Sequence, residues 1–86
     1  YAMDARREEQ VKELFDFVND TYGAPSVVIF NIGANVPESI LTETTRKFTK
    51  IWEMACLSGF LVGREAARRM VPVSRGTIIF TGASGK

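Results

Sequence analysis

The sequence contains no histidine and a single cysteine, Cys56. Without imidazole groups or a cluster of thiols, neither a zinc site nor a histidine-based catalytic triad can be built from these 86 residues. One cysteine also excludes an internal disulfide, and no signal-peptide pattern opens the sequence. We therefore expect a reducing, cytoplasmic setting and no bound metal.

An excess of one charge and a long apolar helix are also missing. Eleven Lys and Arg oppose ten Asp and Glu, which gives a formal net charge of +1. This balance argues against nucleic-acid binding, which usually needs a concentrated basic face. The longest uncharged run in a predicted helix, residues 54–63, is too short to cross a bilayer. The sequence therefore predicts no nucleic-acid partner and no membrane contact.

Hydrophobic residues make up 45% of the chain, which is enough for a folded domain. The first segment with helical periodicity has Asp4 as its expected N-cap and stops at Gly23. Its apolar stripe consists of Val11, Leu14, Phe15, Val18 and Tyr22. This spacing predicts one amphipathic helix with a buried face.

Two short segments, SVVIF at residues 26–30 and GTIIFTG at residues 76–82, are apolar without alternation. Such segments are typical of parallel strands buried on both faces. A long helix is predicted between them, from an N-cap at Thr44 to about Met70. This order predicts an α/β fold, the internal βαβ portion of a doubly wound parallel-sheet (Rossmann) domain. Because two strands do not form an independent sheet, we expect residues 1–86 to be the central part of a single nucleotide-binding domain, truncated at both ends.

The long helix is apolar nearly all round between residues 54 and 62. One sheet covers only one side of a helix, so the other side is expected to contact another helix or another subunit. Three small residues would let such a partner lie close, namely Ser58, Gly59 and Gly63. We therefore expect a homo-oligomer, a dimer or a tetramer, formed through residues 44–70 with Phe60 and Leu61 in the contact.

The expected carboxyl ends of three strands carry small or polar residues. In open parallel sheets ligands bind outside these ends, which here are residues 3–5, 31–35 and 81–85. The residues concerned are Asp4, Asn31, Gly33, Thr81, Gly82 and Ser84. Glycine lets a backbone approach a ring or a sugar, and Asp and Asn offer partners to an adenine edge or a ribose hydroxyl. The pattern favours one rim of a cofactor cleft, although Asp4 could be only an N-cap and Asn31 only part of a turn.

These residues resemble the middle of a short-chain dehydrogenase/reductase, over nearly the whole chain. In that family one strand ends in Asp and a later strand ends in Asn-Asn-Ala-Gly. Here FNIGA places Asn31 at the second Asn, Ile32 at the Ala and Gly33 at the Gly. GTIIFTGAS resembles the strand that leads to the catalytic serine, and FTKIWEMACLSGFLVGREAARRM resembles the long helix that forms a subunit interface in relatives.

The resemblance implies an oxidoreductase that transfers a hydride between NAD or NADP and a small carbonyl or alcohol substrate. It implies that Asp4 contacts the adenine ring and that Asn31, Ile32 and Gly33 line the adenosine side of the cleft. The full set of cofactor-binding residues expected in this way is Asp4, Ala5, Asn31, Ile32, Gly33, Thr81 and Gly82. The resemblance does not distinguish NAD from NADP.

Two positions depart from the family pattern. The catalytic serine falls on Ala83 in strict strand register, and a shift of one residue in the turn would bring Ser84 into place. Ser84 could instead only satisfy backbone groups of the turn. The active-site asparagine of the long helix falls on Cys56, whose thiol cannot replace an amide carbonyl. The other interpretation of Cys56 is a small buried packing residue.

The 86 residues contain neither a glycine-rich phosphate loop nor a Tyr-x-x-x-Lys motif. Tyr22 cannot replace the motif's tyrosine, because it lies on the expected core stripe and has no lysine four residues later. The segment alone is therefore expected to be inactive. The alternative function is a non-catalytic nucleotide-binding or oligomerisation module of the same fold. A methyltransferase is disfavoured, because it would not need FNIGA and FTGAS together.

Overall fold

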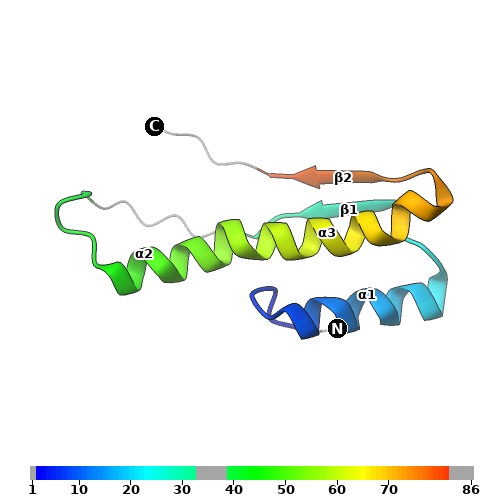
Figure 1. The fold of residues 1–86 in the computed structure, drawn as a ribbon, viewed down its shortest axis with the longest axis horizontal. Coiled ribbons are helices and arrows are strands. Elements are labelled where there is room, and N and C mark those ends of the chain that lie inside the picture. Colours follow the sequence, from blue (N-terminus) through cyan, green and yellow to red (C-terminus); the bar gives the residue numbers. More distant parts are fainter. Residues whose placement is uncertain (1, 33–38, 82–86) are drawn as a thin grey trace.

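The computed structural model describes residues 2–32 and 39–81. The elements are α1 (Glu8–Tyr22), β1 (Val27–Phe30), α2 (Thr45–Trp52), the π-helical turn η1 (Glu53–Leu57), α3 (Ser58–Met70), the 3-10 turn η2 (Val71–Val73) and β2 (Thr77–Phe80). α2, η1 and α3 follow one another without a gap and form one long helix (Figure 1). The predicted order of helix, strand, helix and strand is confirmed.

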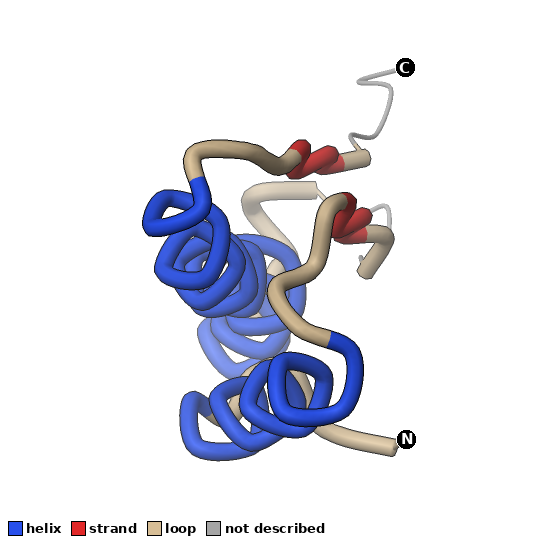
Figure 2. The backbone as a smooth tube through the Cα atoms, turned by 90° about the vertical axis from the view of Figure 1, so that its right-hand side faces the viewer, coloured by secondary structure: helices blue, strands red, loops and turns tan. Residues whose placement is uncertain are grey.

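The two strands are parallel neighbours, paired from Val27 with Thr77 to Phe30 with Phe80. The long helix connects them, so the expected βαβ unit is confirmed. α1 and the long helix lie on the same side of the strands (Figures 1 and 2). Because the two strands are parallel and in register, their carboxyl ends lie at one edge, as the α/β prediction requires.

α1 ends where the sequence predicts and begins later. Gly23 has φ 89° and donates its N–H to the carbonyl of Asn19 at 2.9 Å, which closes the helix. Asp4 is not the N-cap: the cap is Arg7, and no side chain bonds to the first turn there. Instead, the Asp4 carbonyl accepts from the N–H of Arg7 at 3.0 Å, in a turn that precedes the helix. The expectation for Tyr22 was also wrong, because its side chain is 80% exposed.

The long helix follows its predicted boundaries. Thr44 is the N-cap, and its hydroxyl accepts from the N–H of Lys47 at 3.2 Å. The helix runs to Met70, with η1 as an irregular turn in its middle. After that turn the Ser58 hydroxyl donates to the carbonyl of Met54, one helical turn earlier.

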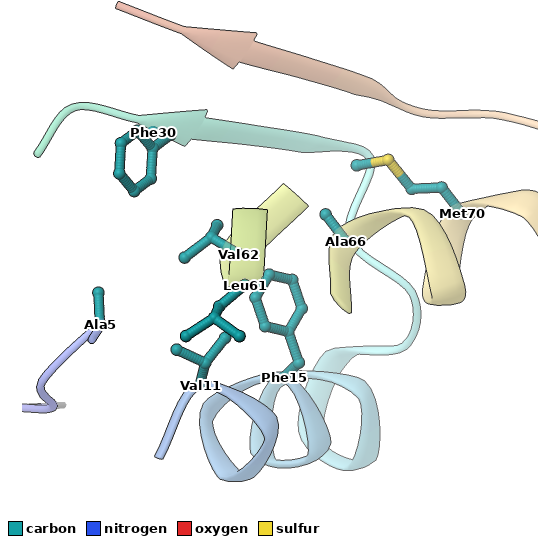
Figure 3. Close-up of a cluster of buried hydrophobic side chains, with 8 residues drawn as sticks. All are labelled: Ala5, Val11, Phe15, Phe30, Leu61, Val62, Ala66 and Met70. Carbon is teal, nitrogen blue, oxygen red and sulfur yellow. The ribbon is translucent and has the colours of Figure 1, made fainter. Parts of the chain in front are cut away.

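The core lies between α1, the long helix and β1, as Figure 3 shows. It consists of Ala5, Val11, Phe15, Phe30, Leu61, Val62, Ala66 and Met70. Leu61 is therefore part of this chain's own core and is not available to a second subunit, whereas Phe60 is 57% exposed. The apolar face of α1 explains this, because it covers the side of α3 that carries Leu61.

Ion pairs join α1 to α3 beside this core. Glu65 is only 2% exposed, and its carboxylate accepts from Arg68 and Arg69, each at 2.7 Å. Arg69 also binds Asp16 of α1 at 2.5 Å. Glu8 at the start of α1 pairs with Arg64 at 2.5 Å. α1 is thus attached to the long helix by one charged pair at its start and another at its middle.

The strands are covered on one face only within the described residues. Phe30 is buried, whereas Val27 is 55%, Ile29 61% and Ile79 44% exposed. The expectation of two buried faces is therefore not met by this part of the chain, because both helices lie on the same side.

Two small residues of α3, Gly59 and Gly63, face the strands and not a partner helix. A Cβ built on Gly59 would lie 3.6 Å from the Phe30 ring, and one on Gly63 would lie 2.9 Å from the ring of Phe80. These glycines let the helix approach its own sheet closely, which corrects their expected role in oligomer contacts. Ser58 is also buried within this chain. None of the described helices is long and apolar enough to cross a membrane.

Candidate functional site

Asn31 and Thr81 follow the two strands and meet at the same edge. The N–H of Thr81 donates to the Phe30 carbonyl at 3.0 Å, which extends the strand pairing by one residue. The Thr81 hydroxyl lies 3.1 Å from the same carbonyl and 2.8 Å from Oδ1 of Asn31, so its single hydrogen is shared between these two acceptors. Because Oδ1 of Asn31 accepts from Thr81, the amide nitrogen of Asn31 remains as a donor at this edge.

Asp4 is fixed in the turn before α1. Its N–H donates to Oε1 of Gln10 at 2.8 Å. Oδ1 of its carboxylate accepts from the N–H and Nε of Arg6 at 3.0 and 3.1 Å, and Oδ2 accepts from Nη2 of Arg6 at 2.9 Å. Arg6 was not expected as the partner of Asp4, because two residues so close in sequence meet only where the backbone turns between them.

The hydrogen bonds from Arg6, first from its side chain and then from its backbone N–H, lower the pKa of Asp4 from 3.8 to about 2. The same pairing raises the pKa of Arg6. Asp4 is therefore an ionised carboxylate at neutral pH, and it can only accept hydrogen bonds.

A cleft of about 490 Å³ opens beside Asp4. Its lining consists of Met3, Asp4, Ala5, Arg6, Ile32, Lys50, Met54 and Ser58. Three of the predicted cofactor-binding residues, Asp4, Ala5 and Ile32, thus come together in one cleft. Asn31 and Thr81 lie at the adjoining sheet edge and are exposed. Gly33, Gly82, Ala83 and Ser84 lie outside the described residues.

The long helix supplies three lining residues that the sequence prediction missed. Lys50, Met54 and Ser58 are spaced four residues apart and present one face to the cleft. That spacing was the available signal. It could not show whether the face meets a ligand or the core.

A second cleft, of about 540 Å³, lies at the amino end of β2 beside Met70, Arg75 and Gly76. In parallel sheets, ligands bind at the carboxyl ends of the strands, so the cleft beside Asp4 is the candidate site. The part of the chain that the structure describes contains no group of three or more Cys, Asp or Glu placed to hold a metal ion.

Cys56 lies in η1 and is exposed. Its interpretation as a buried packing residue is therefore wrong. The π-helical turn η1, which contains Cys56, shifts the direction in which side chains point between α2 and α3.

A protein-family model described as "Enoyl-(Acyl carrier protein) reductase" matches residues 1–86. Among curated proteins, the chain is 30% identical over 83 residues to "Short chain aldehyde dehydrogenase 1" of Euphorbia lathyris, covering 94% of this chain and 29% of that protein. It is also 30% identical over 78 residues to a "Short-chain type dehydrogenase/reductase" of Picea abies, covering 88% of this chain and 29% of that protein.

Solved structures show the same likeness. A short-chain dehydrogenase from Rhodopseudomonas palustris superposes with a TM-score of 0.89 at 45% identity, covering 95% of this chain and 38% of that one. ElxO with NADP bound superposes with a TM-score of 0.93 at 25% identity, covering 100% of this chain and 37% of that one. The chain spans 29% of the length of each of the two curated relatives named above. With the family model matched over residues 1–86, the chain belongs to the short-chain dehydrogenase/reductase family.

Proposed function

We propose that residues 1–86 are the central part of a single Rossmann domain in an NAD- or NADP-dependent oxidoreductase. The enzyme would transfer a hydride between the nicotinamide ring and a small carbonyl or alcohol substrate. The observation that carries the proposal is the cleft that brings Asp4, Ala5 and Ile32 together beside the carboxyl end of β1.

The cleft suits the adenosine half of a dinucleotide. Ile32 and Met54 offer apolar surface to the faces of a purine ring, and the ionised Asp4 offers an acceptor to its edge. Asn31, with its amide oxygen already bonded to Thr81, offers a donor at the adjoining edge. The name of ElxO with NADP bound supports a nicotinamide cofactor in a relative. The choice between NAD and NADP is left to the binding experiment.

In this proposal Gly33, Thr81 and Gly82 continue the cofactor cleft, and Ser84 or the neighbouring Ala83 stands at the position of the family's serine. A serine there would donate a hydrogen bond to the substrate oxygen. Cys56 stands at the position of the family's asparagine. The bound cofactor supplies the hydride acceptor or donor, and the residues of this chain hold its adenosine half in place.

The long helix is also proposed to join two copies of the protein. The aromatic side chains of Phe48, Trp52 and Phe60 are 62%, 46% and 57% exposed. They lie on the long helix and are not covered by α1 or by the strands of this chain. A second copy meeting the same helix would bury them.

A non-catalytic nucleotide-binding module is the second candidate function. The thiol of Cys56 at the family's asparagine position favours it, because a thiol is a weak hydrogen-bonding group. Turnover by the intact protein separates the two candidates.

The test uses the intact protein with NADH and NADPH in titration calorimetry, followed by assays with ketones, aldehydes and alcohols. We expect one cofactor to bind and Asp4→Ala to weaken its binding about tenfold, as the loss of one charge-assisted hydrogen bond does. The control is Asp20→Ala, which removes an exposed carboxylate of α1. Failure of the intact protein to bind either cofactor would overturn the proposal. Binding without turnover would favour the non-catalytic module.

A further inference from the structure

The side chain of Arg6 encloses the carboxylate of Asp4 at the edge of the candidate cleft. Its backbone N–H and Nε both reach Oδ1, at 3.0 and 3.1 Å, and Nη2 reaches Oδ2 at 2.9 Å. Such a fork fixes a carboxylate in one plane, which a single point charge cannot do. The neighbouring Arg7 comes no closer than 4.0 Å through its Nε and makes no such fork.

These bonds leave Asp4 little freedom to accept another donor. A carboxylate has about four acceptor positions. Arg6 fills both positions of Oδ1 and one of Oδ2, so one position on Oδ2 remains for a ligand. Both residues line the cleft, and their side chains are about one-third exposed, at 33% for Asp4 and 34% for Arg6.

We propose that Arg6 is a positioning residue, which acts through Asp4 to make the cleft selective for a purine with an exocyclic amino group. The inference rests on the proposed function and adds base selectivity to it. Adenine presents an amino donor on its edge, where hypoxanthine presents a keto oxygen. An ionised carboxylate with a single open acceptor position binds the first and repels the second.

The charges around the pair support this assignment. Asp4 is ionised at neutral pH and carries no proton to offer a keto oxygen; the side-chain hydrogen bond from Arg6, the main cause, lowers its pKa further, to about 2. Arg7 adds a weaker attraction on the same carboxylate. Glu53 of η1 attracts Arg6, and Lys50 lines the cleft.

The experiment measures two ligands on the intact protein by titration calorimetry. One is the oxidised cofactor that the wild-type protein binds, and the other is its analogue with hypoxanthine in place of adenine. The variants are Arg6→Ala, Arg6→Gln, and Arg7→Ala as the matched control. Arg6→Gln keeps a side chain of intermediate length and an amide donor while it removes the charge and the fork.

We expect the wild-type protein to prefer adenine about tenfold or more, which is the discrimination that one charge-assisted hydrogen bond gives. Arg6→Ala and Arg6→Gln should both reduce this preference to about threefold or less, with affinity for the hypoxanthine analogue unchanged. Arg7→Ala should keep the wild-type preference. A purely structural role for Arg6 would weaken the binding of both ligands equally.

Three results would overturn the inference and leave the proposed function standing: equal affinity of the wild-type protein for the two ligands, an unchanged preference in both Arg6 variants, or an equal loss for both ligands. Arg6→Gln decides the question by itself if Arg6→Ala does not fold. Absence of any cofactor binding to the wild-type protein would instead overturn the proposed function.

Discussion

Asp4 is held by its neighbours in the turn and not by the first turn of a helix. A helix cap would have directed the carboxylate toward the N–H groups of α1. The turn instead directs it to Arg6 at the edge of the cleft. The difference of a few residues in the start of α1 therefore decides whether Asp4 is available to a ligand.

The acidity of Asp4 gives a prediction for single residues. Its pKa in the folded protein is about 2, below the ordinary value of 3.8. Because the folded value is the lower one, the ionised carboxylate stabilises the fold above about pH 4, and this contribution is lost as the pH falls toward 2. Carbon-13 NMR of the Asp4 carboxyl in the intact protein should give a midpoint near 2, and Arg6→Ala should move it toward 3.8. A wild-type midpoint near 3.8 would show that the pair with Arg6 does not persist in solution.

Gly76 gives a second prediction at this scale. Its φ is +143°, and a Cβ built on it would lie 2.4 Å from Sδ and 3.0 Å from Cβ of Met70. Gly76→Ala should therefore lower the free energy of unfolding by about 1–3 kcal/mol, through backbone strain and overpacking. The matched variant is Gly59→Ala, where the new Cβ meets the Phe30 ring at an ordinary 3.6 Å. That variant should change stability by less than about 1 kcal/mol, since alanine also favours the helix. Urea denaturation of the intact protein measures both, and equal losses would contradict this account of Gly76.

At the scale of elements, the packing of α1 on α3 combines apolar contact with buried charge. Val11 and Phe15 of α1 cover Leu61 of α3 (Figure 3). Glu65 is buried beside this contact and depends on Arg68 and Arg69 for its hydrogen bonds. Removal of either arginine would leave this buried carboxylate with one partner fewer, which lowers the free energy of unfolding.

Arg69→Ala should be the more damaging of the two arginine substitutions. The side chain of Arg69 is 14% exposed and binds both Glu65 and Asp16, whereas that of Arg68 is 55% exposed and, among the residues the structure describes, pairs with Glu65. We expect a loss of about 3 kcal/mol for Arg69→Ala, typical of a buried pair, and about 1 kcal/mol or less for Arg68→Ala. Thermal and urea unfolding of the intact protein compare them. Similar losses for both variants would show that the link to Asp16 contributes nothing.

The exposed aromatic side chains of the long helix give a prediction about assembly. Phe60 is 57% exposed, and the Arg64 guanidinium stacks on its ring at 4.8 Å from the ring centre. If a second copy buries it, Phe60→Ser should weaken association about thirtyfold, as the loss of a central aromatic residue of an interface does. Tyr22→Ser is the control, because Tyr22 is an 80% exposed aromatic residue on α1. Sedimentation of the intact protein would contradict the interface if both variants assemble like the wild type.

At the scale of the whole molecule, the sequence predicted the elements well because local signals determine them. Thr44 as an N-cap, Gly23 as a helix stop and the two apolar strands all depend on nearby residues. The gathering of Asp4 and Ile32 followed from a rule for parallel sheets, whose carboxyl ends meet at one edge.

The features that the sequence did not predict depend on which part of the chain packs against each face of a helix. Periodicity places Gly59 and Gly63 on one face of the long helix, but it cannot show that this face meets Phe30 and Phe80 of the strands and not a second helix. The same limit applies to Lys50 and Met54, whose place in the cleft follows from the path of the chain around them. Tyr22 fits the spacing of the core stripe, yet it is exposed because it lies at the end of α1, where the chain turns toward β1.

The most direct test of the account is a crystal structure of the intact protein with its oxidised nicotinamide cofactor bound. We predict that the adenine ring lies in the cleft between Ile32 and Met54, with its amino group within hydrogen-bond distance of the Asp4 carboxylate. Density for the adenine ring at any other place, with the cleft beside Asp4 filled only by solvent, would contradict it.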